Sequence, residues 1–426
     1  MMQINKIRLV NFRGMEDLTV EFSPGVNVII GDNGAGKSSL LNGICVALGG
    51  LFSSLYIKGI NASRQIQDED IRMTSVLVGD TTENTEKHFP VTVEVDLLLF
   101  NGQQRYEVVK ENLMSPSIMR DRSLQNNMRE AISNPARKLP LLNYQSAERK
   151  FVPKTQSEDV IKLRNPERKE GYKNAFSGTS DFSEILDWCT QMDYSEYKLK
   201  HEVREYRNFK SIISKFMIEL MNLKTAPRVD YAAAIGQLMF YNGSNGEAIN
   251  ILSAGYQNVL CIMMDLARRT VLLNPTMDEF EALEGVVIID EIDMHLHPKW
   301  QWKILDALKA TFPKVQFIVA THSPMIISSA KDAKLIKMIT PNEIEYLTSA
   351  YGYNISDVVE LRQGSTELPQ HAKELKNALE DSIDDGNFEK AEQLVREAVE
   401  IFGENSSPAR EMRDFLDVNR WIDEAE

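Results

Sequence analysis

The chain has 426 residues, of which 43% are hydrophobic and 26% charged, an ordinary globular composition that excludes fibrous and disordered classes. This length predicts two or three packed units. The net charge of −14 argues against a protein that coats nucleic acid through its overall field. No apolar run approaches the roughly 18 residues that a bilayer-spanning helix needs, and three scattered cysteines fit reduced thiols. We therefore expect a cytoplasmic protein that makes no membrane contact.

The charge is unevenly distributed along the chain. Residues 371–426 hold 16 acidic and 7 basic side chains, a net charge of −9, whereas residues 101–230 hold 23 basic and 18 acidic, a net of +5. A DNA-facing surface is therefore more plausible in the middle of the chain than in its tail, although a merely solvated mixture of charges is the favoured interpretation of the middle.

The first hundred residues predict strands and one helix. Alternating apolar residues indicate three strands within residues 3–30, and a helix is expected from Lys37 to about Leu48. Two further strands, at 91–100 and 105–110, flank Asn101-Gly102, a pair that favours a hairpin turn. These elements predict an N-terminal lobe.

One run between these elements carries a specific chemistry. It reads VNVIIGDNGAGKSSL and matches G-x-x-x-x-G-K-[ST] between a β-branched strand and the start of a helix. Backbone amides of such a loop surround phosphates, Lys37 reaches the terminal phosphates, and the Ser38 hydroxyl can hold Mg²⁺. The sequence therefore predicts an ATP site made of Gly31, Asp32, Asn33, Gly34, Ala35, Gly36, Lys37, Ser38 and Ser39. A plain glycine-rich turn is the alternative.

The rest of the chain changes character twice. Residues 111–235 give a short apolar strand at 139–144, a charged loop from Lys154 to Lys173, and helical patterns at 183–193 and 196–222. From about 237, strands and helices alternate, including a helix at 299–310, which predicts a parallel sheet covered on both faces. The last residues predict three amphipathic helices, at about 368–383, 387–402 and 407–420.

Acidic and imidazole groups follow two of the predicted parallel strands. The strand GVVII is followed by Asp290 and Glu291, which predicts that Asp290 holds Mg²⁺ and that Glu291 acts as the base on the attacking water. The strand VQFIVA is followed by Thr321 and His322, and we expect His322 to contact the γ-phosphate. The alternatives are a structural acidic pair and a hydrogen-bonded turn histidine.

Together these motifs resemble an ABC-class ATPase of the SMC and RecF kind. The residues that carry the resemblance are NFRG at 11–14, the phosphate loop, LSAGYQ at 252–257, VVIIDEIDMHLHP and THSP. The resemblance implies an α/β P-loop fold of the ABC type, with a mixed sheet, a helical insertion and a C-terminal helical tail. It also implies two heads that sandwich ATP and Mg²⁺ between them.

By the same resemblance, further residues acquire roles. Ser253 and Gly255 would close over the γ-phosphate bound by a second copy, Asp293 would lie in the loop between the two sites, and Arg13 would lie near the nucleotide. The glutamine loop, which contributes to the metal site in this class, matches Gln145.

Two features depart from the usual pattern. Ala254 and Tyr256 stand where the common signature has glycine and glutamine, which puts the strength of trans engagement and turnover in question. The H-x-H of His295 and His297 suggests a metal only weakly, because a third ligand at suitable spacing is missing.

Within the class, the chain resembles the PtuA-like ATPases of Septu and related retron-type anti-phage systems. The run DEIDMHLHPKWQWKIL, the lack of a long coiled coil and the acidic helical tail carry this resemblance. It implies an ATPase that assembles with copies of itself and controls an HNH nuclease partner of the PtuB kind, with DNA contacted directly or through that partner. The alternatives are a RecF-like DNA-repair ATPase and an ATP-locked scaffold with little turnover.

We therefore expect four parts. They are an ATPase lobe with the phosphate loop at 1–110, a helical insertion with the glutamine loop at 111–236, a second ATPase lobe at 237–365, and an acidic interaction tail at 366–426.

Overall fold

The fold is that of a computed structural model, which describes residues 2–53, 63–78, 82–147, 167–178, 182–359, 370–404 and 406–423. The chain divides into two compact units, Met1–Ile355 and Ser356–Glu426, and each is described by itself. The first thirteen residues of the expected charged loop, 154–166, and the expected boundary between residues 365 and 366 lie outside the described residues. None of the helices described there is both long and apolar enough to cross a membrane.

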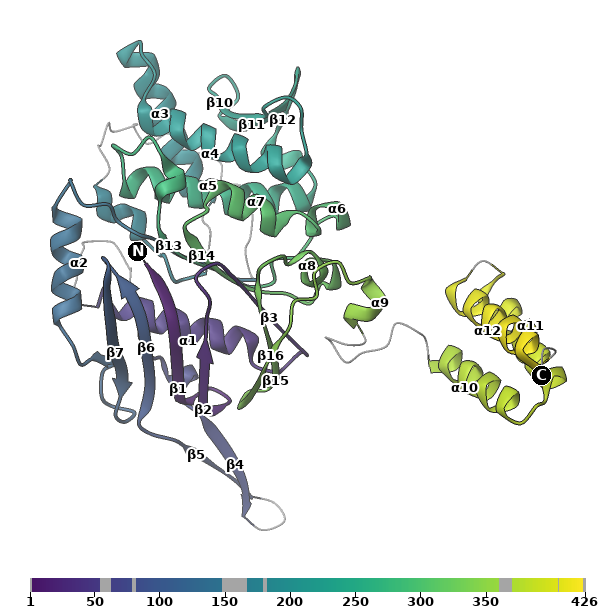
Figure 1. The fold of residues 1–426 in the computed structure, drawn as a ribbon. Coiled ribbons are helices and arrows are strands. Elements are labelled where there is room, and N and C mark those ends of the chain that lie inside the picture. The colour runs from purple at the N-terminus through teal and green to yellow at the C-terminus, as the bar shows by residue number, and fades with distance from the viewer. Residues whose placement is uncertain are drawn as a thin grey trace. The chain divides into compact units, whose positions relative to one another are not determined.

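The first unit contains an antiparallel sheet in the order β2-β1-β6-β7-β8 (Figure 1). Buried apolar side chains alternate with more exposed, mostly polar ones along β1 and β6, as expected for a sheet with one face on the core. Its members are β1 Gln3–Phe12, β2 Met15–Glu21, β6 Val91–Leu99, β7 Gly102–Lys110 and β8 Ile118–Met119. The three predicted strands within residues 3–30 are confirmed, since the third is β3 Val26–Gly31 of the next sheet.

The turn between β6 and β7 differs from the prediction by one residue. Leu99 pairs with Gly102, so the two turn residues are Phe100 and Asn101, not Asn101 and Gly102. Both have left-handed backbone conformations, with φ of 50° and 66°, as a tight twisted hairpin requires. The expectation placed the turn on glycine because glycine adopts these angles without strain, whereas the chain places an aromatic residue there.

A mixed sheet in the order β16-β15-β3-β14-β13-β9 forms the centre of the unit. Only the edge strand β16 is antiparallel to its neighbour. β13 and β14 are buried along their whole length, which explains their unbroken apolar sequences. The remaining strands are β9 Leu141–Gln145, β13 Gly285–Ile289, β14 Val315–Ala320, β15 Lys334–Thr340 and β16 Glu343–Leu347. The predicted mixed-sheet α/β fold is confirmed.

Helices separate and cover the two sheets. α1, Lys37–Gly50, follows the phosphate loop and contacts β1, β6 and β7 of the antiparallel sheet as well as β3. It approaches closely because a Cβ on Gly43 would lie 2.6 Å from the Leu9 side chain. On the far side of the mixed sheet, α5 Ala254–Leu273 packs on β9 and on α4 Arg204–Met221, which in turn packs on α7 Ile304–Thr311.

Several predicted helix boundaries were wrong. The expected helix at 299–310 is two helices, α6 Pro298–Gln301 and α7, which begins after Lys303. The two patterns at 183–193 and 196–222 are α3 Phe182–Leu199 and α4, so α3 continues through the expected break. Tertiary packing rather than local periodicity sets these ends.

Short elements missed by the sequence patterns surround this framework. They are the hairpin β4 Met73–Val78 with β5 Thr82–Lys87, the meander β10 Arg228–Ala232, β11 Gln237–Asn242 and β12 Asn245–Ala248, and the helices α2 Ser123–Ser133 and α9 Ile355–Val358 (Figure 1). The sequence does predict a short helix after Pro324, and α8 Pro324–Ser329 confirms it. β5 consists wholly of polar residues, β12 buries only Ala248, and the short strands β10 and β11 bury apolar side chains only at Val229, Leu238 and Phe240, so hydrophobic alternation marks these strands weakly.

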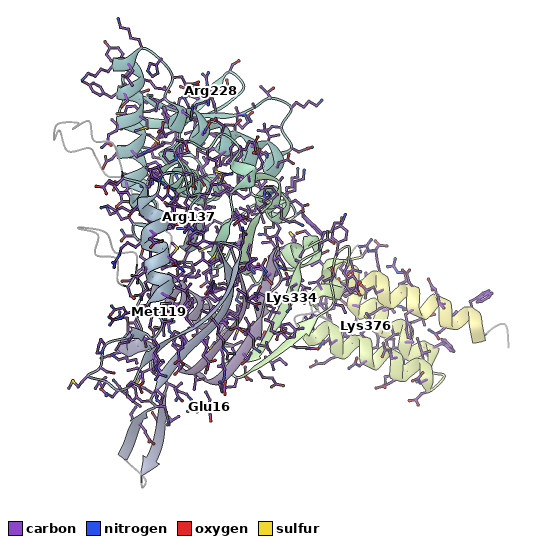
Figure 2. All side chains as sticks on the ribbon, turned by 60° about the vertical axis from the view of Figure 1, so that its left-hand side comes forward. Glu16, Met119, Arg137, Arg228, Lys334 and Lys376 are labelled. Carbon is purple, nitrogen blue, oxygen red and sulfur yellow. The ribbon has the colours of Figure 1, made fainter. Side chains whose placement is uncertain are left out.

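The second unit is a bundle of three helices, α10 Gln370–Asp384, α11 Phe388–Phe402 and α12 Ser407–Asp423, as the periodicity predicted. Its core consists of the buried side chains of Leu375, Leu379, Ala391, Val395, Ala398, Ala409, Met412 and Leu416. Lys376 on α10 pairs with Glu411 on α12 at 2.7 Å and is labelled in Figure 2. Large apolar side chains at Phe415, Val418 and Trp421 stay exposed on α12.

Candidate functional site: a phosphate loop at the carboxyl edge of the mixed sheet

The phosphate loop leaves the carboxyl end of β3 and enters α1. Gly31, Gly34 and Gly36 have φ of 147°, 86° and 100°, which side chains rarely adopt. A Cβ on Gly31 would also collide with the carbonyl oxygen of Met338. These glycines are therefore required by the backbone path, and the loop leads directly into the start of α1, where unpaired backbone amides favour an anion.

Lys37 folds back into this loop. Its Nζ donates to the carbonyl oxygens of Gly31 at 2.7 Å and Asp32 at 2.9 Å. Burial lowers the pKa of Lys37, and the carboxylates of Asp290, Asp32, Glu291 and Asp293 oppose this shift only in part. The ammonium therefore gains from additional negative charge near it, such as a phosphate.

A cavity of about 230 Å³ lies beside the lysine. Its walls come from the loops that follow three neighbouring strands, β3, β14 and β13, at their carboxyl ends. They include Asn33, Gly34, Gly36, Lys37, Ser38, Ser39, Asp290, Glu291, Thr321 and His322. The structure thus brings together the phosphate loop, the acidic pair and the histidine that the sequence predicted separately, at the edge where ligands of open α/β sheets bind.

The acidic pair is held in a defined turn. Asp290 is 3% exposed, and its backbone N–H donates to the Gln145 carbonyl at 2.8 Å. Glu291 has a left-handed backbone with φ of 44°, a conformation that is rare for a glutamate. This strained conformation turns the backbone out of line with β13 immediately after Asp290. Both carboxylates consequently border the cavity that contains Lys37.

A hydrogen-bonded chain fixes the neighbouring loop. The Thr321 hydroxyl donates to Asp293 at 2.5 Å and accepts from the Ser323 amide at 3.0 Å. The Ser323 hydroxyl donates to Gln301 at 2.6 Å. His322 lies between these two anchored residues, so its backbone position is set from both sides. Asp293 is placed near the site through Thr321 but does not line the cavity.

The signature residues lie at the start of α5, away from this cavity. Ser253 is the N-cap residue of α5, and its side chain makes no capping hydrogen bond. A Cβ on Gly255 would lie 2.6 Å from the carbonyl oxygen of His295, and Asn258 donates to Met294 at 2.7 Å. The start of α5 is therefore fixed against the loop that follows the acidic pair. Ser253 and Gly255 do not line the cavity of the same chain.

The packing of Tyr256 explains why a tyrosine stands where the common signature has glutamine. Its ring packs edge-on against Trp300 at 4.6 Å and near Phe240 at 5.9 Å. The tyrosine thus joins α5 to α6 and to the β10–β12 meander as part of an aromatic cluster. Its role is in packing behind the signature, while Ser253 and Gly255 remain at the helix start.

Two predicted site residues lie apart from the cavity. Arg13 donates through Nε to Asp70 at 2.9 Å, and Asp70 is also paired with Arg64 at 2.9 Å. Gln145 ends β9 with its side chain buried, and its Nε2 donates to Asn143 at 2.7 Å and to Asp265 at 2.9 Å. The backbone of Gln145 contacts Asp290, but its amide points into the core under α5, and its role toward a metal stays a prediction.

The cluster around Gln145 contains charged residues that the sequence patterns did not reveal. Asp265 on α5 accepts from Arg269 at 2.8 Å, and Arg269 donates to the Gly171 and Lys173 carbonyls at 2.9 and 2.8 Å. Burial favours the neutral acid, but the two adjacent arginines outweigh it and lower the pKa of Asp265. The signal was present as D-x-x-R-R inside an otherwise apolar helix, where buried charges need partners.

Comparison with known proteins agrees with this geometry. The model of a family described as AAA domain matches residues 6–220, half of the chain. The chain belongs to this family. With its phosphate loop and acidic pair, it is a P-loop ATPase.

Relatives extend over most of the chain. It is 27% identical to a retron Vc95 probable ATPase of Vibrio cholerae, covering 88% of this chain and 81% of that one. It is 23% identical to the Septu protein PtuA of Bacillus thuringiensis, covering 92% and 91%. A solved SMC head domain from Pyrococcus furiosus, bound to the C-terminal domain of ScpA, aligns over 82% and 97% with a TM-score of 0.47 and 15% identity.

Proposed function

We propose that this chain binds ATP and Mg²⁺ in the cavity beside Lys37 and hydrolyses ATP there. The observation that carries the proposal is the convergence of the phosphate loop, Asp290, Glu291 and His322 on one cavity from three adjacent strand ends. The buried ammonium and the backbone amides of the loop suit the negative phosphates of a triphosphate. The carboxylates suit the cation that accompanies it.

Each residue has a role that follows from its position. Lys37 exchanges its two carbonyl partners for phosphate oxygens, and the Ser38 hydroxyl and Asp290 carboxylate are the ligands for Mg²⁺. Glu291 orients and deprotonates the attacking water, and His322 contacts the terminal phosphate. Bound Mg²⁺ neutralises charge on the phosphates.

We further propose that two copies face each other across the nucleotide. Ser253 and Gly255 lie outside their own chain's cavity, yet they sit at the start of a twenty-residue helix. The unsatisfied amides of such a helix start favour an anion. A second copy could supply that anion, bound at its own phosphate loop, and Asp293 lies in the loop that joins the two surfaces.

The biological role follows from the relatives. Their names, Septu protein and retron ATPase, support a place in an anti-phage defence complex. In this proposal, the acidic bundle at 356–426, with exposed Phe415, Val418 and Trp421, holds a nuclease partner of the HNH kind, and nucleotide-driven closure controls it. DNA reaches the complex directly or through that partner.

Head closure is tested with Glu291→Gln, which retains ATP binding but blocks the water-activating step. We expect ATP to convert this variant to a species of at least two copies by sedimentation velocity. The matched control is Glu291→Gln combined with Lys37→Ala, which stays in its nucleotide-free state. An ATP-saturated Glu291→Gln that keeps its nucleotide-free mass contradicts closure.

The partner is tested by co-expression with the neighbouring gene, followed by native mass measurement. A complex that contains an HNH protein supports the defence role. Recovery of the ATPase alone, with hydrolysis stimulated by DNA, supports a RecF-like repair ATPase instead. Steady hydrolysis over many turnovers excludes an ATP-locked scaffold, because a scaffold would stop after one.

A further inference from the structure

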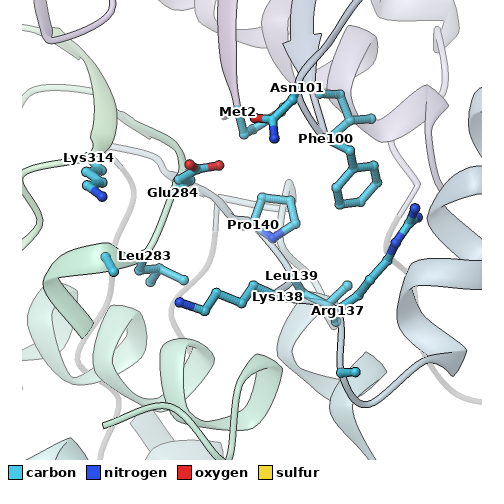
Figure 3. A pocket seen from close by; sticks show the side chains of 13 residues that line it. Met2, Phe100, Asn101, Arg137, Lys138, Leu139, Pro140, Leu283, Glu284 and Lys314 are labelled. Carbon is cyan, nitrogen blue, oxygen red and sulfur yellow. The ribbon is translucent and has the colours of Figure 1, made fainter. Parts of the chain in front are cut away.

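A second cavity, of about 520 Å³, opens at the other end of the mixed sheet. Pro140, Glu284 and Lys314 line it and immediately precede β9, β13 and β14. Because these strands are parallel, the cavity lies at their amino ends, whereas the phosphate loop lies at their carboxyl ends. Phe100, from the turn between β6 and β7, adds a wall from the antiparallel sheet (Figure 3).

Positive charge gathers around this cavity. Arg137, Lys138 and Lys314 line it, against the single carboxylate of Glu284. Within the described part of the chain, none of the three cations forms an ion pair with a carboxylate. In a chain with a net charge of −14, three cations gathered around one carboxylate mark a place suited to an anion.

The segment that carries two of these cations is fixed in place. Arg168 donates to the backbone carbonyls of Asn134 at 2.7 Å and Arg137 at 2.5 Å, and Asn274 pairs with both the N–H and the carbonyl of Leu139 at 2.9 Å. The two Asn274 hydrogen bonds are buried, and together with the exposed Arg168 contacts they hold the backbone of this irregular segment. The backbone that carries Arg137 and Lys138 is therefore ordered before a ligand binds, which reduces the entropy lost on binding.

Phe100 provides a second, independent observation. A bulky residue with φ of 50° is an outlier, and a tight turn is more stable with glycine or asparagine there. Backbone strain of this kind persists where a side chain is needed in one place. The Phe100 ring lies 5.2 Å from the Arg137 guanidinium and borders an apolar floor formed by Met2, Pro140 and Leu283.

We propose that this cavity binds a nucleoside phosphate, with the phosphate at Lys138 and Lys314 and the nucleoside on the Phe100 side. A flat ring stacks on an aromatic side chain or a guanidinium, and lysines serve phosphates as point charges. The volume suits one nucleotide and is too small for a duplex. The nucleotide is either a free one or the end of a single strand. This site is separate from the proposed ATP site.

The test uses the full chain with Lys37→Ala, so that the phosphate loop does not contribute. Equilibrium dialysis measures the binding of AMP and of a 5′-phosphorylated tetradeoxynucleotide. We expect Lys138→Gln with Lys314→Gln to raise the Kd at least tenfold. Lys198→Gln with Lys200→Gln removes the same charge from exposed positions on and just after α3 and should leave the Kd unchanged.

The two probes separate the sources of the ligand. Equal affinity for AMP and the oligonucleotide indicates a free nucleotide, and at least tenfold tighter oligonucleotide binding indicates a strand end. The proposal is overturned if neither probe binds, or if both lysine pairs change the Kd equally. Should the double glutamine variant fail to fold, Lys138→Arg with Lys314→Arg must retain binding, and Arg137→Gln must weaken it.

Discussion

The two ends of the mixed sheet carry opposite chemistry although the same strands connect them. At the carboxyl ends, Asp290, Glu291 and Asp293 surround one buried ammonium, that of Lys37. At the amino ends, Arg137, Lys138 and Lys314 surround one carboxylate. An acidic edge with a single lysine suits a triphosphate that brings its own cation, whereas a basic edge suits a phosphate that arrives without one. The two proposed sites therefore differ in how charge is arranged at opposite ends of one sheet.

The two ends also differ in how their backbone is fixed. Glycines shape the carboxyl end, and positive φ at Gly31, Gly34 and Gly36 is accommodated without strain. The amino end places a phenylalanine at positive φ and fixes its other segment with Arg168 and Asn274. A sequence motif reveals the glycines at the carboxyl end, whereas no motif reveals the contacts that fix the amino end.

Glu291→Gln should lower the rate of ATP hydrolysis by about a thousandfold, because a positioned general base contributes roughly 10²–10⁴-fold. ATP affinity should change by less than about threefold, since glutamine has the same shape and the loop contacts remain. Phosphate release at steady state and equilibrium ATP binding measure the two quantities. Glu345→Gln on the exposed edge strand β16 is the control and should leave both unchanged. Equal hydrolysis by Glu291→Gln and wild type would remove Glu291 from the reaction.

Asp265→Asn should lower the free energy of unfolding of the first unit by about 3 kcal/mol, because it leaves the Arg269 cation buried without its partner. Urea unfolding of the purified variant measures this. Since the pKa of Asp265 is lowered in the folded chain, its contribution is complete above the unfolded value of about 4 and is lost as the pH falls further. The difference between variant and wild type should therefore shrink in acid.

The double variant Asp265→Asn with Arg269→Gln is the control for this cluster. It should be less destabilised than the sum of the two single variants, because the unpaired charge is gone. Strict additivity would contradict the coupling of the two side chains.

Phe100→Asn should leave the unfolding free energy unchanged or raise it by up to about 1 kcal/mol, because asparagine tolerates the left-handed turn position. The same substitution should weaken nucleoside phosphate binding at the amino end and leave ATP binding at the carboxyl end as it is. A stability loss above about 1 kcal/mol, measured in urea, would instead assign the ring to packing.

Removal of residues 360–426 should have the smallest effect on either end of the sheet. The first unit ends near Ile355, so ATP affinity should stay within about twofold of the full chain. The same truncation should abolish recovery of the proposed nuclease partner. If the truncated chain lost ATP binding but kept the partner, ATP binding would depend on the second unit and partner binding on the first.

Much of the carboxyl end could be predicted from sequence because its residues are consecutive. The phosphate loop follows its strand directly, and Asp290, Glu291 and His322 follow theirs, so strand order alone brings them together. The amide contacts of Gln145 could not be predicted, because they depend on Asp265, 120 residues away. The Phe100 turn also lies one residue from where Asn101-Gly102 suggested it, because the hairpin register pairs Leu99 with Gly102.

Whether the cavity beside Lys37 is the ATP site is decided by measuring ATP binding to Lys37→Ala. We expect this variant, folded to the same melting temperature within a few degrees, to lose ATP binding by at least a hundredfold and to hydrolyse none. Binding and hydrolysis at wild-type levels would contradict this assignment.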